Sequence, residues 1–536
     1  MREFLNKNKF YIFSFAAVFF LVFIVYFRCQ NFDFIYLDDD ALILNGIAQS
    51  NSLSKAPDFF FKPVFEAVES KFYRPLLNIS LLADTLICGG FAGFYHFTNI
   101  IIHVCAVFLL MLVLLSLNFS KKVSLTASLI FAAHPALVSS TAWIPGRNDS
   151  LLAFFCFLSF IFFIKSARRQ NMLYCFASSI SFFAAILTKE TAAVLPAAFA
   201  AYYIFYKTKR SRTNIIIMSV LSSSVLILYF ILRTYAMQNS NPVPLNLIAD
   251  NIFLSFKALF WYAGLFFFTE KIILYPQIDI TFAIVLKGVF PLAVLGAAAF
   301  FFRKKINFKT VLFASSWFIL FLIPTLAMPN NNYYTHRLYL PAAGLIILFL
   351  EITKPVYKNQ KLKNVFFILA AAAIPVLALA SYKQCENYRD RSSFWFNALK
   401  ENPNSSRVNA GVGRYYSSLG DNDNYEEYSL KALQYASKND RPRILTQLGS
   451  AYMAKKDYVR AQECFNFAIE LNPYAEGAYY YLSYIYKNQN SKEQAAEIIA
   501  QALKIMPQSK MMQKRMKELN GKTEEEGFSN YSISVK

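Results

Sequence analysis

The sequence predicts an all-α protein in two parts, a polytopic membrane helix bundle of about 11 spans followed by a soluble α-solenoid of helical repeats. One observation behind this is the composition: 56% of the 536 residues are hydrophobic, with 56 Phe, and they gather in long apolar runs. Runs of roughly 20 apolar residues are long enough to cross a bilayer. The other is a change near residue 390 to a charged sequence in which one helical pattern recurs every 34 residues.

The positive charge of the chain follows the apolar runs. A net charge of +21 often indicates nucleic acid as a partner. Here the basic residues lie mostly in short loops between apolar segments, which is typical of membrane topology signals. Nucleic acid is therefore not an expected partner. The seven Cys show no paired spacing, so neither a zinc site nor a disulfide framework is predicted.

The first apolar segment, Phe10 to Phe27, is 18 residues long and lacks a recognisable cleavage site, so we interpret it as a retained anchor. A loop over 28–95 is too interrupted by charge to span, and its amphipathic pieces are expected along the membrane surface. The segment Ile252 to Phe268 is predicted to be re-entrant or interfacial, because a full crossing would put Arg303 to Lys305 on the wrong side. Ten further spans are predicted near 97–117, 123–138, 150–164, 172–188, 190–206, 214–232, 282–302, 310–328, 338–353 and 364–381.

Alternate loops between these spans are basic and contain no Asp or Glu. They hold Lys121 and Lys122; Lys165, Arg168 and Arg169; Lys207, Lys209, Arg210 and Arg212; Arg303, Lys304, Lys305 and Lys309; and Lys354, Lys358, Lys361 and Lys363. Together with the basic N-terminus they predict a cytoplasmic N-terminus, with the loop 28–95 and everything after residue 381 on the other side. The sparse Cys and simple basic loops favour a cell inner membrane, although an endoplasmic reticulum membrane would give the same topology.

The C-terminal part repeats with the period and residue pattern of tetratricopeptide repeats. Leu445, Leu448, Gly449, Tyr452, Ala461, Phe465, Ala468 and Pro473 correspond to Tyr479, Leu482, Ser483, Tyr486, Ala495, Ile499, Ala502 and Pro507. With an earlier unit around Val412 and a partial one over Phe394 to Pro403, about three and a half units are expected. The predicted domains are a membrane domain over 1–388, a repeat domain over 389–520 and a disordered tail over 521–536.

The candidate site begins with Asp38, Asp39 and Asp40, an acidic motif directly beyond the first span. Three adjacent carboxylates cannot all ionise readily unless a cation, a substrate group or a basic side chain compensates their charge. A solvated acidic turn is the plain alternative. Ionisable residues at the same predicted membrane face are Arg74, His96, His103, His134, Arg147, Asp149, Lys189, Glu190, His336 and Arg337. Such groups at the ends of spans are costly unless they are paired or functional.

This set of residues suits a phosphate-linked substrate dissolved in lipid. Asp38 or Asp39 can accept a proton from an attacking hydroxyl, and cations can stabilise the charge on a leaving phosphate. The predicted phosphate-binding residues are Arg337, Arg147, Lys189 and Arg74, and the supporting residues are Asp40, His96, His103, His134, Asp149, Glu190 and His336.

Each of these residues also has a plain structural role open to it. A histidine one turn into a span, such as His103, is commonly a hydrogen-bonded packing residue. Lys189 with Glu190 can simply cap adjacent helix ends as an ion pair, and Arg147 with Asp149 can pair within a loop. Arginines at a membrane face also anchor lipid headgroups, which is the alternative for Arg74 and Arg337.

Several motifs in order resemble those of the transmembrane-and-tetratricopeptide O-mannosyltransferases and their bacterial relatives, within the GT-C class of glycosyltransferases. They are Asp38-Asp39 followed by Ile43-Leu44-Asn45; Tyr73-Arg74-Pro75-Leu76; Tyr95-His96-Phe97-Thr98-Asn99-Ile100 with His103; His134-Pro135 to Trp143 with Gly146-Arg147-Asn148-Asp149; Arg337-Leu338-Tyr339-Leu340-Pro341; and the C-terminal repeats. The resemblance covers nearly the whole chain.

The resemblance implies a GT-C-like enzyme that uses a polyprenyl-phosphate-linked sugar on the non-cytoplasmic side and inverts the sugar carbon. Asp38 and Asp39 match the catalytic signature of the family, and Arg147 and Arg337 are expected near the donor phosphate. The family often has Glu before the arginine of the tenth span, where this chain has His336. GT-C enzymes differ in metal use and the acids form no convincing ligand set, so no cofactor or metal is predicted, and a divalent ion is left open.

The predicted function is transfer of a sugar, mannose being one candidate, from a polyprenyl-phosphate donor to an acceptor hydroxyl, with Ser or Thr of a protein as the expected acceptor. The repeat array is expected to hold the polypeptide in its concave groove. One alternative keeps the donor and changes the acceptor to a lipid or a surface polysaccharide. Another is a non-catalytic assembly scaffold, because fold resemblance alone does not fix function.

Overall fold

The computed structural model describes residues 2–44, 46–47, 52–65, 72–169, 171–206, 212–237, 251–252, 255–269, 274, 282–327 and 333–521. The chain divides into two compact units, Met1–Asp390 and Arg391–Lys536, where the sequence placed the boundary between 388 and 389. The predicted tail beyond residue 521, the basic loop residues Lys207, Lys209 and Arg210, and Asn45 of the family motif lie outside the described residues.

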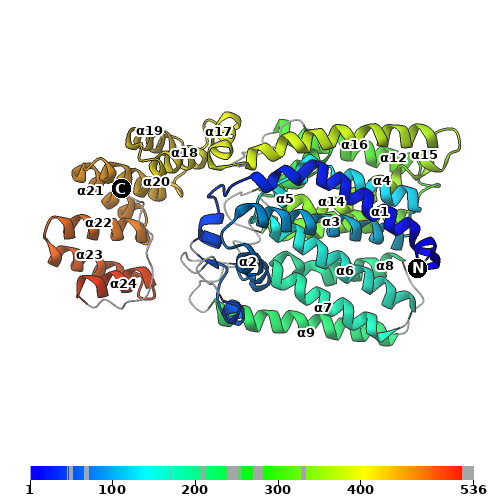
Figure 1. The fold of residues 1–536 in the computed structure, drawn as a ribbon, viewed down its shortest axis with the longest axis horizontal. Helices are drawn as coiled ribbons and strands as arrows, with labels where there is room; N and C mark the ends of the chain where they lie inside the picture. The colour runs from blue at the N-terminus through cyan, green and yellow to red at the C-terminus, as the bar shows by residue number, and fades with distance from the viewer. Residues whose placement is uncertain are drawn as a thin grey trace. The chain divides into compact units, whose positions relative to one another are not determined.

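The first unit is a bundle of long helices that run along a common direction (Figure 1). They are α1 Arg2–Tyr26, α3 Ala92–Ser116, α4 Lys121–Ala132, α6 Arg147–Arg169, α7 Met172–Thr188, α8 Leu195–Tyr206, α9 Arg212–Ala236, α12 Phe282–Phe301, α13 Phe308–Leu326, α14 Tyr339–Ile352 and α16 Lys363–Cys385. Shorter elements connect them: η1 Phe27–Asn31, η2 Asp40–Leu44, η4 Leu53–Phe61, α2 Pro75–Cys88, η5 Pro135–Leu137, α5 Ser139–Ala142, η6 Glu190–Val194, α11 Lys257–Phe267, η7 Thr335–Leu338, α15 Lys354–Lys358 and η8 Glu386–Tyr388.

The bundle is that of a multi-pass membrane protein, with fewer full-length spans than predicted. Eight helices in the described ranges are long and apolar enough to cross a bilayer, and a ninth crossing results if α4 and the segment Pro135–Ala142, bent by 59°, form one span. The shortfall from about 11 lies at 172–188 and 190–206, where α7 has 17 residues and α8 has 12. These helices rise about 26 and 18 Å, less than the roughly 30 Å of a bilayer core. The predicted span over 190–206 loses its first residues to η6, which turns Glu190 towards Arg74.

Helix α11 corresponds to the segment predicted to be re-entrant or interfacial. It has 11 residues, so it rises only about 16 Å, roughly half of a bilayer core. Eight of its residues are buried, and it packs against α12.

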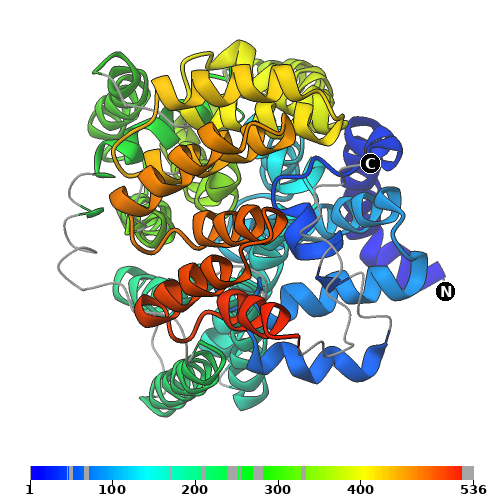
Figure 2. The same ribbon diagram turned by 90° about the vertical axis from the view of Figure 1, so that its left-hand side faces the viewer.

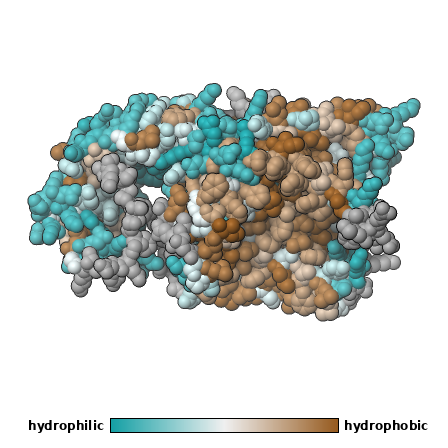
Figure 3. All heavy atoms as spheres, viewed as in Figure 1, coloured by the Kyte–Doolittle hydropathy of each residue, from teal (hydrophilic) through white to brown (hydrophobic). Residues whose placement is uncertain are grey.

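The polarity of the helices follows their place in the bundle. Helix α14 is central, and Phe349 is its exposed residue. Helix α16 is peripheral and leaves apolar side chains on its surface, among them Ile368 and Val376, which are 66% and 67% exposed. The visible face of the bundle is correspondingly hydrophobic over most of its length (Figure 3). Such an apolar exterior is expected where lipid, rather than water, surrounds the helices.

A seam of polar contacts joins the end of α1 to the end of the first unit. Arg28 forms an ion pair with Glu386 at 3.2 Å and lies over the ring of Tyr382. Further along, the Asp33 N–H donates to the Arg389 carbonyl oxygen at 2.8 Å. The extended segment that leads to the acidic motif is therefore fixed against the residues that lead into the second unit.

The second unit is the predicted α-solenoid. After α17 Arg391–Glu401 come three antiparallel helix pairs, namely α18 Ser406–Ser418 with α19 Asn422–Gln434, α20 Arg441–Ala454 with α21 Tyr458–Leu471, and α22 Glu476–Asn488 with α23 Lys492–Ile505, closed by α24 Lys510–Leu519. These helices, coloured gold to red, stack one after another in chain order (Figure 2). Gly449 is required by this packing, because a Cβ there would lie 2.5 Å from the Phe465 ring. The array of three pairs with a preceding half unit is confirmed, and α24 covers its end.

Candidate active site

Of the acidic motif, Asp38 and Asp39 lie in the segment between η1 and η2, and Asp40 is the first residue of η2. Asp39 is 1% exposed; its Oδ2 accepts a hydrogen bond from the Ile35 N–H at 3.2 Å, and its Oδ1 has no hydrogen-bond partner among the described residues. Tyr36, two residues before the motif, has a φ of 56°, a strained backbone for a side chain of this size. A strained turn that holds a buried, half-satisfied carboxylate is typical of functional sites.

Asp38 and Asp39 differ in the pKa of their carboxyl groups. Burial, with repulsion from Asp38 and Asp40, raises the pKa of Asp39 to about 8. Burial and Asp40 also raise the pKa of Asp38, but the nearby Arg74 guanidinium opposes this and the pKa of Asp38 is about 6. At neutral pH, Asp38 is therefore mostly ionised and Asp39 mostly keeps its proton. Because Asp39 is buried and Asp38 and Asp40 are only partly exposed, the motif is not a fully solvated acidic turn.

Arg74, the cation that acts on Asp38, is held by Glu190. The Arg74 Nε and Nη2 donate to Glu190 Oε2 at 3.1 and 3.0 Å, and the Tyr73 N–H donates to Glu190 Oε1 at 3.2 Å. Pro75 follows directly and starts α2, so the arginine sits at the N-cap position of a helix whose first residue has no N–H to satisfy. Arg74 is thereby fixed between the acidic motif and the turn that follows α7.

Lys189 occupies that turn and is paired with Asp149. Its Nζ donates to both carboxylate oxygens of Asp149 at 2.7 Å and to Asn148 Oδ1 at 3.1 Å. The His336 Nε2 is 3.9 Å from Asp149 Oδ2. Asp149 comes close to these partners because Gly146 lets the turn before α6 pack against the Ser139 carbonyl, where a Cβ would lie at 2.1 Å.

Arg337 differs from the other two cations because it forms no ion pair with an Asp or Glu among the described residues. Its guanidinium lies 5.3 Å from the centre of the Tyr334 ring, and its Nη1 is buried without a hydrogen-bond partner in the described parts of the chain. Arg74 and Arg337 are both within electrostatic range of Asp149. We call Arg74, Lys189 and Arg337, with their partners Glu190, Asp149 and His336, the cation cluster. Arg337 is one of the four residues that the sequence predicted to bind the donor phosphate, with Arg147, Lys189 and Arg74.

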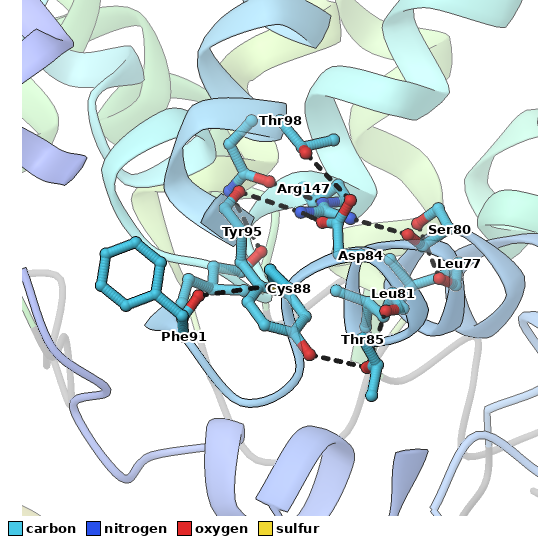
Figure 4. Close-up of polar contacts among 12 residues, drawn as sticks. Leu77, Ser80, Leu81, Asp84, Thr85, Cys88, Phe91, Tyr95, Thr98 and Arg147 are labelled. Carbon is cyan, nitrogen blue, oxygen red and sulfur yellow. Dashed lines mark hydrogen bonds and ion pairs between the residues drawn. The ribbon is translucent and has the colours of Figure 1, made fainter. Parts of the chain in front are cut away.

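Arg147 was predicted to bind phosphate, but it lies outside the cation cluster. It is fully buried, and all three guanidinium nitrogens donate: to Asp84 Oδ2, to Asn99 Oδ1 at 2.6 Å, and to the carbonyls of Ser80 and Tyr95 at 3.1 and 2.9 Å (Figure 4). Its charge is neutralised by Asp84, so it ties α2 and α3 to the start of α6. It does not pair with Asp149, which Lys189 holds instead.

Two of the predicted supporting histidines, His103 and His134, are hydrogen-bonded packing residues. His103 accepts from the Tyr339 hydroxyl at Nδ1, 2.6 Å away, and its Nε2 faces the Ala132 carbonyl at 3.3 Å. His134 caps η5, donates from Nε2 to the Phe266 carbonyl at 2.9 Å and stacks on the ring of that phenylalanine. His96 is buried against Phe32, and neither of its ring nitrogens has a side-chain hydrogen bond to the described residues, so no packing role is assigned to it. His336 is the histidine that lies in the cation cluster.

Sequence reasoning missed Asp84 and Asn99, the residues that hold Arg147. The Asp84 carboxylate also accepts from the Thr98 hydroxyl at 2.9 Å, and the Asn99 amide donates to three carbonyls of the segment before α6, those of Thr141, Trp143 and Ile144. A signal was available, because a single carboxylate in an otherwise apolar helix demands a buried cation. Across the described residues, no three His, Cys, Asp or Glu side chains converge in a way that could hold a metal ion.

The fold and this site define a class: polytopic all-α membrane proteins with a buried acidic motif beside a cluster of cations, continued by a repeat solenoid. A family model described as a tetratricopeptide repeat matches residues 442–474 and 476–509.

Among curated relatives, the chain is 30% identical over 182 residues to protein O-mannosyl-transferase Tmtc2 of Drosophila melanogaster, covering 32% of this chain and 19% of that protein. It is 30% identical over 163 residues to protein O-mannosyl-transferase TMTC4 of Homo sapiens, covering 27% and 22%. It is 23% identical over 505 residues to protein O-mannosyl-transferase TMTC3 of Homo sapiens, covering 84% and 50%.

The predicted resemblance to the transmembrane-and-tetratricopeptide O-mannosyltransferases is confirmed by these matches. The chain spans about a fifth of the length of the first two of these relatives and half of the third.

Proposed function

We propose that the protein is a membrane glycosyltransferase that moves a sugar from a polyprenyl-phosphate-linked donor to an acceptor hydroxyl on the non-cytoplasmic side. The observation that carries this proposal is the buried acidic motif beside a cation cluster whose Arg337 has a buried, unpartnered guanidinium nitrogen. The names of the relatives support mannose as the sugar and a protein as the acceptor. The basic loops of the sequence support the assignment of the reaction to the non-cytoplasmic side of the membrane.

In the proposed reaction Asp38 is the general base. Its carboxylate takes the proton of the acceptor hydroxyl as the hydroxyl oxygen forms a bond to the anomeric carbon from the face opposite the phosphate. The bond from that carbon to the phosphate oxygen breaks, and the electron pair leaves with the phosphate, so the sugar carbon is inverted. Arg337, with Arg74 beside it, stabilises the added negative charge. Asp39, which keeps its proton near neutral pH, is suited to donate a hydrogen bond to a sugar or acceptor oxygen.

The surface of α9 offers a path for the lipid part of the donor. An apolar groove on this helix is lined by Ile227, Phe230, Ile231, Thr234 and Tyr235. On the same helix, the ring of Tyr229 packs against that of Tyr73 at 5.6 Å, and Tyr73 directly precedes Arg74. A prenyl chain along α9 would therefore present its phosphate near the cation cluster. The repeat array is the proposed holder of an extended polypeptide acceptor.

The direct test is transfer by the purified full-length protein. We expect a product by mass spectrometry when a Ser- and Thr-containing peptide is supplied with one of a panel of polyprenyl-phosphate sugars, mannose first. Asp38→Asn with Asp39→Asn should abolish transfer, and Arg337→Gln should reduce the rate at least a hundredfold, as is typical when a group that stabilises the transition state is lost.

Matched controls lie on the same chain. Asp58→Asn changes an exposed carboxylate in the loop 28–95, and Arg303→Gln changes an exposed arginine far along the sequence from the cluster; both should leave the rate unchanged. Full activity of the double Asn variant would refute the acidic motif as the catalytic centre. Transfer only to lipid or polysaccharide acceptors would keep the chemistry and replace the proposed protein acceptor.

A further inference from the structure

A second polar site lies at the other end of α3 from the candidate active site. His96, in the first turns of α3, contacts Phe32 of the segment that carries the acidic motif, whereas the pocket follows the last residue of the helix, Ser116. Twenty residues of α-helix separate these points, about 30 Å. The pocket is a cavity of about 460 Å³ lined by Asn118, Phe119, Ser120, Lys122, Val123, Lys354, Tyr357, Lys358, Gln360, Lys363 and Phe367, and we call it the basic pocket.

The charge of the basic pocket is uniformly positive. Its described lining includes four lysines and no Asp or Glu. Lys354 is held by the buried Glu351 at 2.8 Å, and the Lys122 ammonium lies 4.1 Å from the centre of the Phe367 ring. Lys358 and Lys363 form no ion pair among the described residues. Three lysines therefore bring uncompensated charge to one cavity, an arrangement that suits an anion.

The backbone adds to this preference for an anion. Helix α4, of 12 residues, starts at the pocket with Ser120 as its N-cap, whose hydroxyl accepts from the Val123 N–H at 3.4 Å. The N–H groups of the first turn and the positive end of the helix dipole favour a negatively charged group there. Phosphate is the biological anion that lysines and a helix N-terminus commonly bind together.

Part of the lining of the basic pocket is apolar, which indicates what carries the phosphate. Phe119, Val123 and Tyr357 line the pocket and are buried. Beyond Lys363, α16 continues with Ile368 and Leu369 exposed on its surface by 66% and 65%. A free phosphate would make no use of these surfaces, whereas a phospholipid presents a charged headgroup joined to glycerol and acyl chains.

We propose that the basic pocket binds the headgroup phosphate of an anionic phospholipid, with the acyl chains lying along the start of α16. This site is separate from the proposed donor site and does not depend on the enzymatic activity. It gives the lysines around α15 a role beyond setting topology, because they form a defined pocket rather than a diffuse charge. Anionic lipid there would link α15 and α16 to the turn between α3 and α4.

The test is native mass spectrometry of the full-length protein released from detergent after incubation with phosphatidylglycerol or phosphatidylcholine. We expect bound phosphatidylglycerol and little phosphatidylcholine. The triple variant Lys122→Gln, Lys358→Gln, Lys363→Gln should lose about 100-fold in affinity, since each lysine near an anionic headgroup contributes roughly a factor of five. The matched control, Arg303→Gln with Lys304→Gln and Lys305→Gln, removes three exposed charges from another basic loop and should leave binding unchanged.

Three outcomes would overturn the proposal. One is equal retention of phosphatidylglycerol by the triple variant while its thermal unfolding matches that of the unchanged protein. Another is equal loss of lipid by the control, which would indicate diffuse attraction to positive charge. The third concerns incubation with 10 mM inorganic phosphate. If phosphate displaced the lipid and alone stabilised the protein against heat as much as the lipid does, the pocket would bind a free anion.

Discussion

The buried pair of Arg147 and Asp84 allows a sharp test of whether this arginine is structural or contacts the donor. Arg147→Met leaves the Asp84 carboxylate, which is 4% exposed, without its counter-charge. Removing one partner of such a buried pair destabilises a protein by about 3–5 kcal/mol. Since the arginine also donates to Asn99, Ser80 and Tyr95, we expect the upper part of this range, a change of roughly 1,000-fold in the folding equilibrium.

The double variant separates the pair from the general effect of mutation. Asp84→Leu alone should be similarly destabilising, because it leaves a guanidinium buried. Arg147→Met with Asp84→Leu should be less destabilising than the sum of the single changes by about 2–3 kcal/mol, since no unpaired charge remains. The free energies can be measured by unfolding of the purified protein in mixed micelles with tryptophan fluorescence as the readout.

The control is Arg168→Met, an exposed arginine at the other end of the same helix, whose Nη2 donates to the Ser116 carbonyl. It should change the free energy of unfolding by about 0.5 kcal/mol or less, as is usual for surface substitutions. If Arg147→Met left stability unchanged and abolished transfer, or if the single effects simply added, the structural assignment of Arg147 would be wrong.

Three further predictions concern the acidic motif, a buried histidine and the repeats. If Asp38 is the base, kcat/KM should rise as pH rises through about 6 and then level off, because the protonated acid cannot accept a proton. Arg74→Gln should move this midpoint upward, since the guanidinium of the unchanged protein lowers the pKa of Asp38. An unmoved midpoint would contradict the assignment. His103→Phe should lower the free energy of unfolding by about 1–3 kcal/mol through two lost hydrogen bonds, with an unchanged rate per folded molecule; a selective loss of rate would speak for a catalytic role. Gly449→Val should make the repeat unit more sensitive to limited proteolysis, because the added side chain meets the ring of Phe465, and equal sensitivity would contradict the tight packing.

The extent to which the sequence predicted the fold depends on how local each signal is. The repeats were predictable because their period places equivalent residues at neighbouring helix contacts. The length of the predicted span over 190–206 was less predictable. Hydropathy does not reveal that its first residues form η6, which brings Glu190 to Arg74.

The site shows the same contrast between local and distant signals. Asp38 to Asp40 and Arg337 became candidates because charged residues at the ends of apolar runs stand out in the sequence. The contacts of Arg147 and His134 were not predicted, because their partners lie far away in sequence: Asp84 is 63 residues from Arg147, and Phe266 is 132 residues from His134. Arg147 and Arg337 were both predicted to bind phosphate, yet Arg147 forms an ion pair with Asp84 whereas Arg337 forms none among the described residues.

The seam between the end of α1 and the last residues of the first unit has a mechanical consequence. The Arg389 carbonyl receives the Asp33 N–H, so the backbone two residues ahead of the repeat unit is tied to the backbone five residues ahead of Asp38. Tension applied to the start of the solenoid, for instance by a polypeptide being drawn along it, would be transmitted first to the segment that carries the carboxylates.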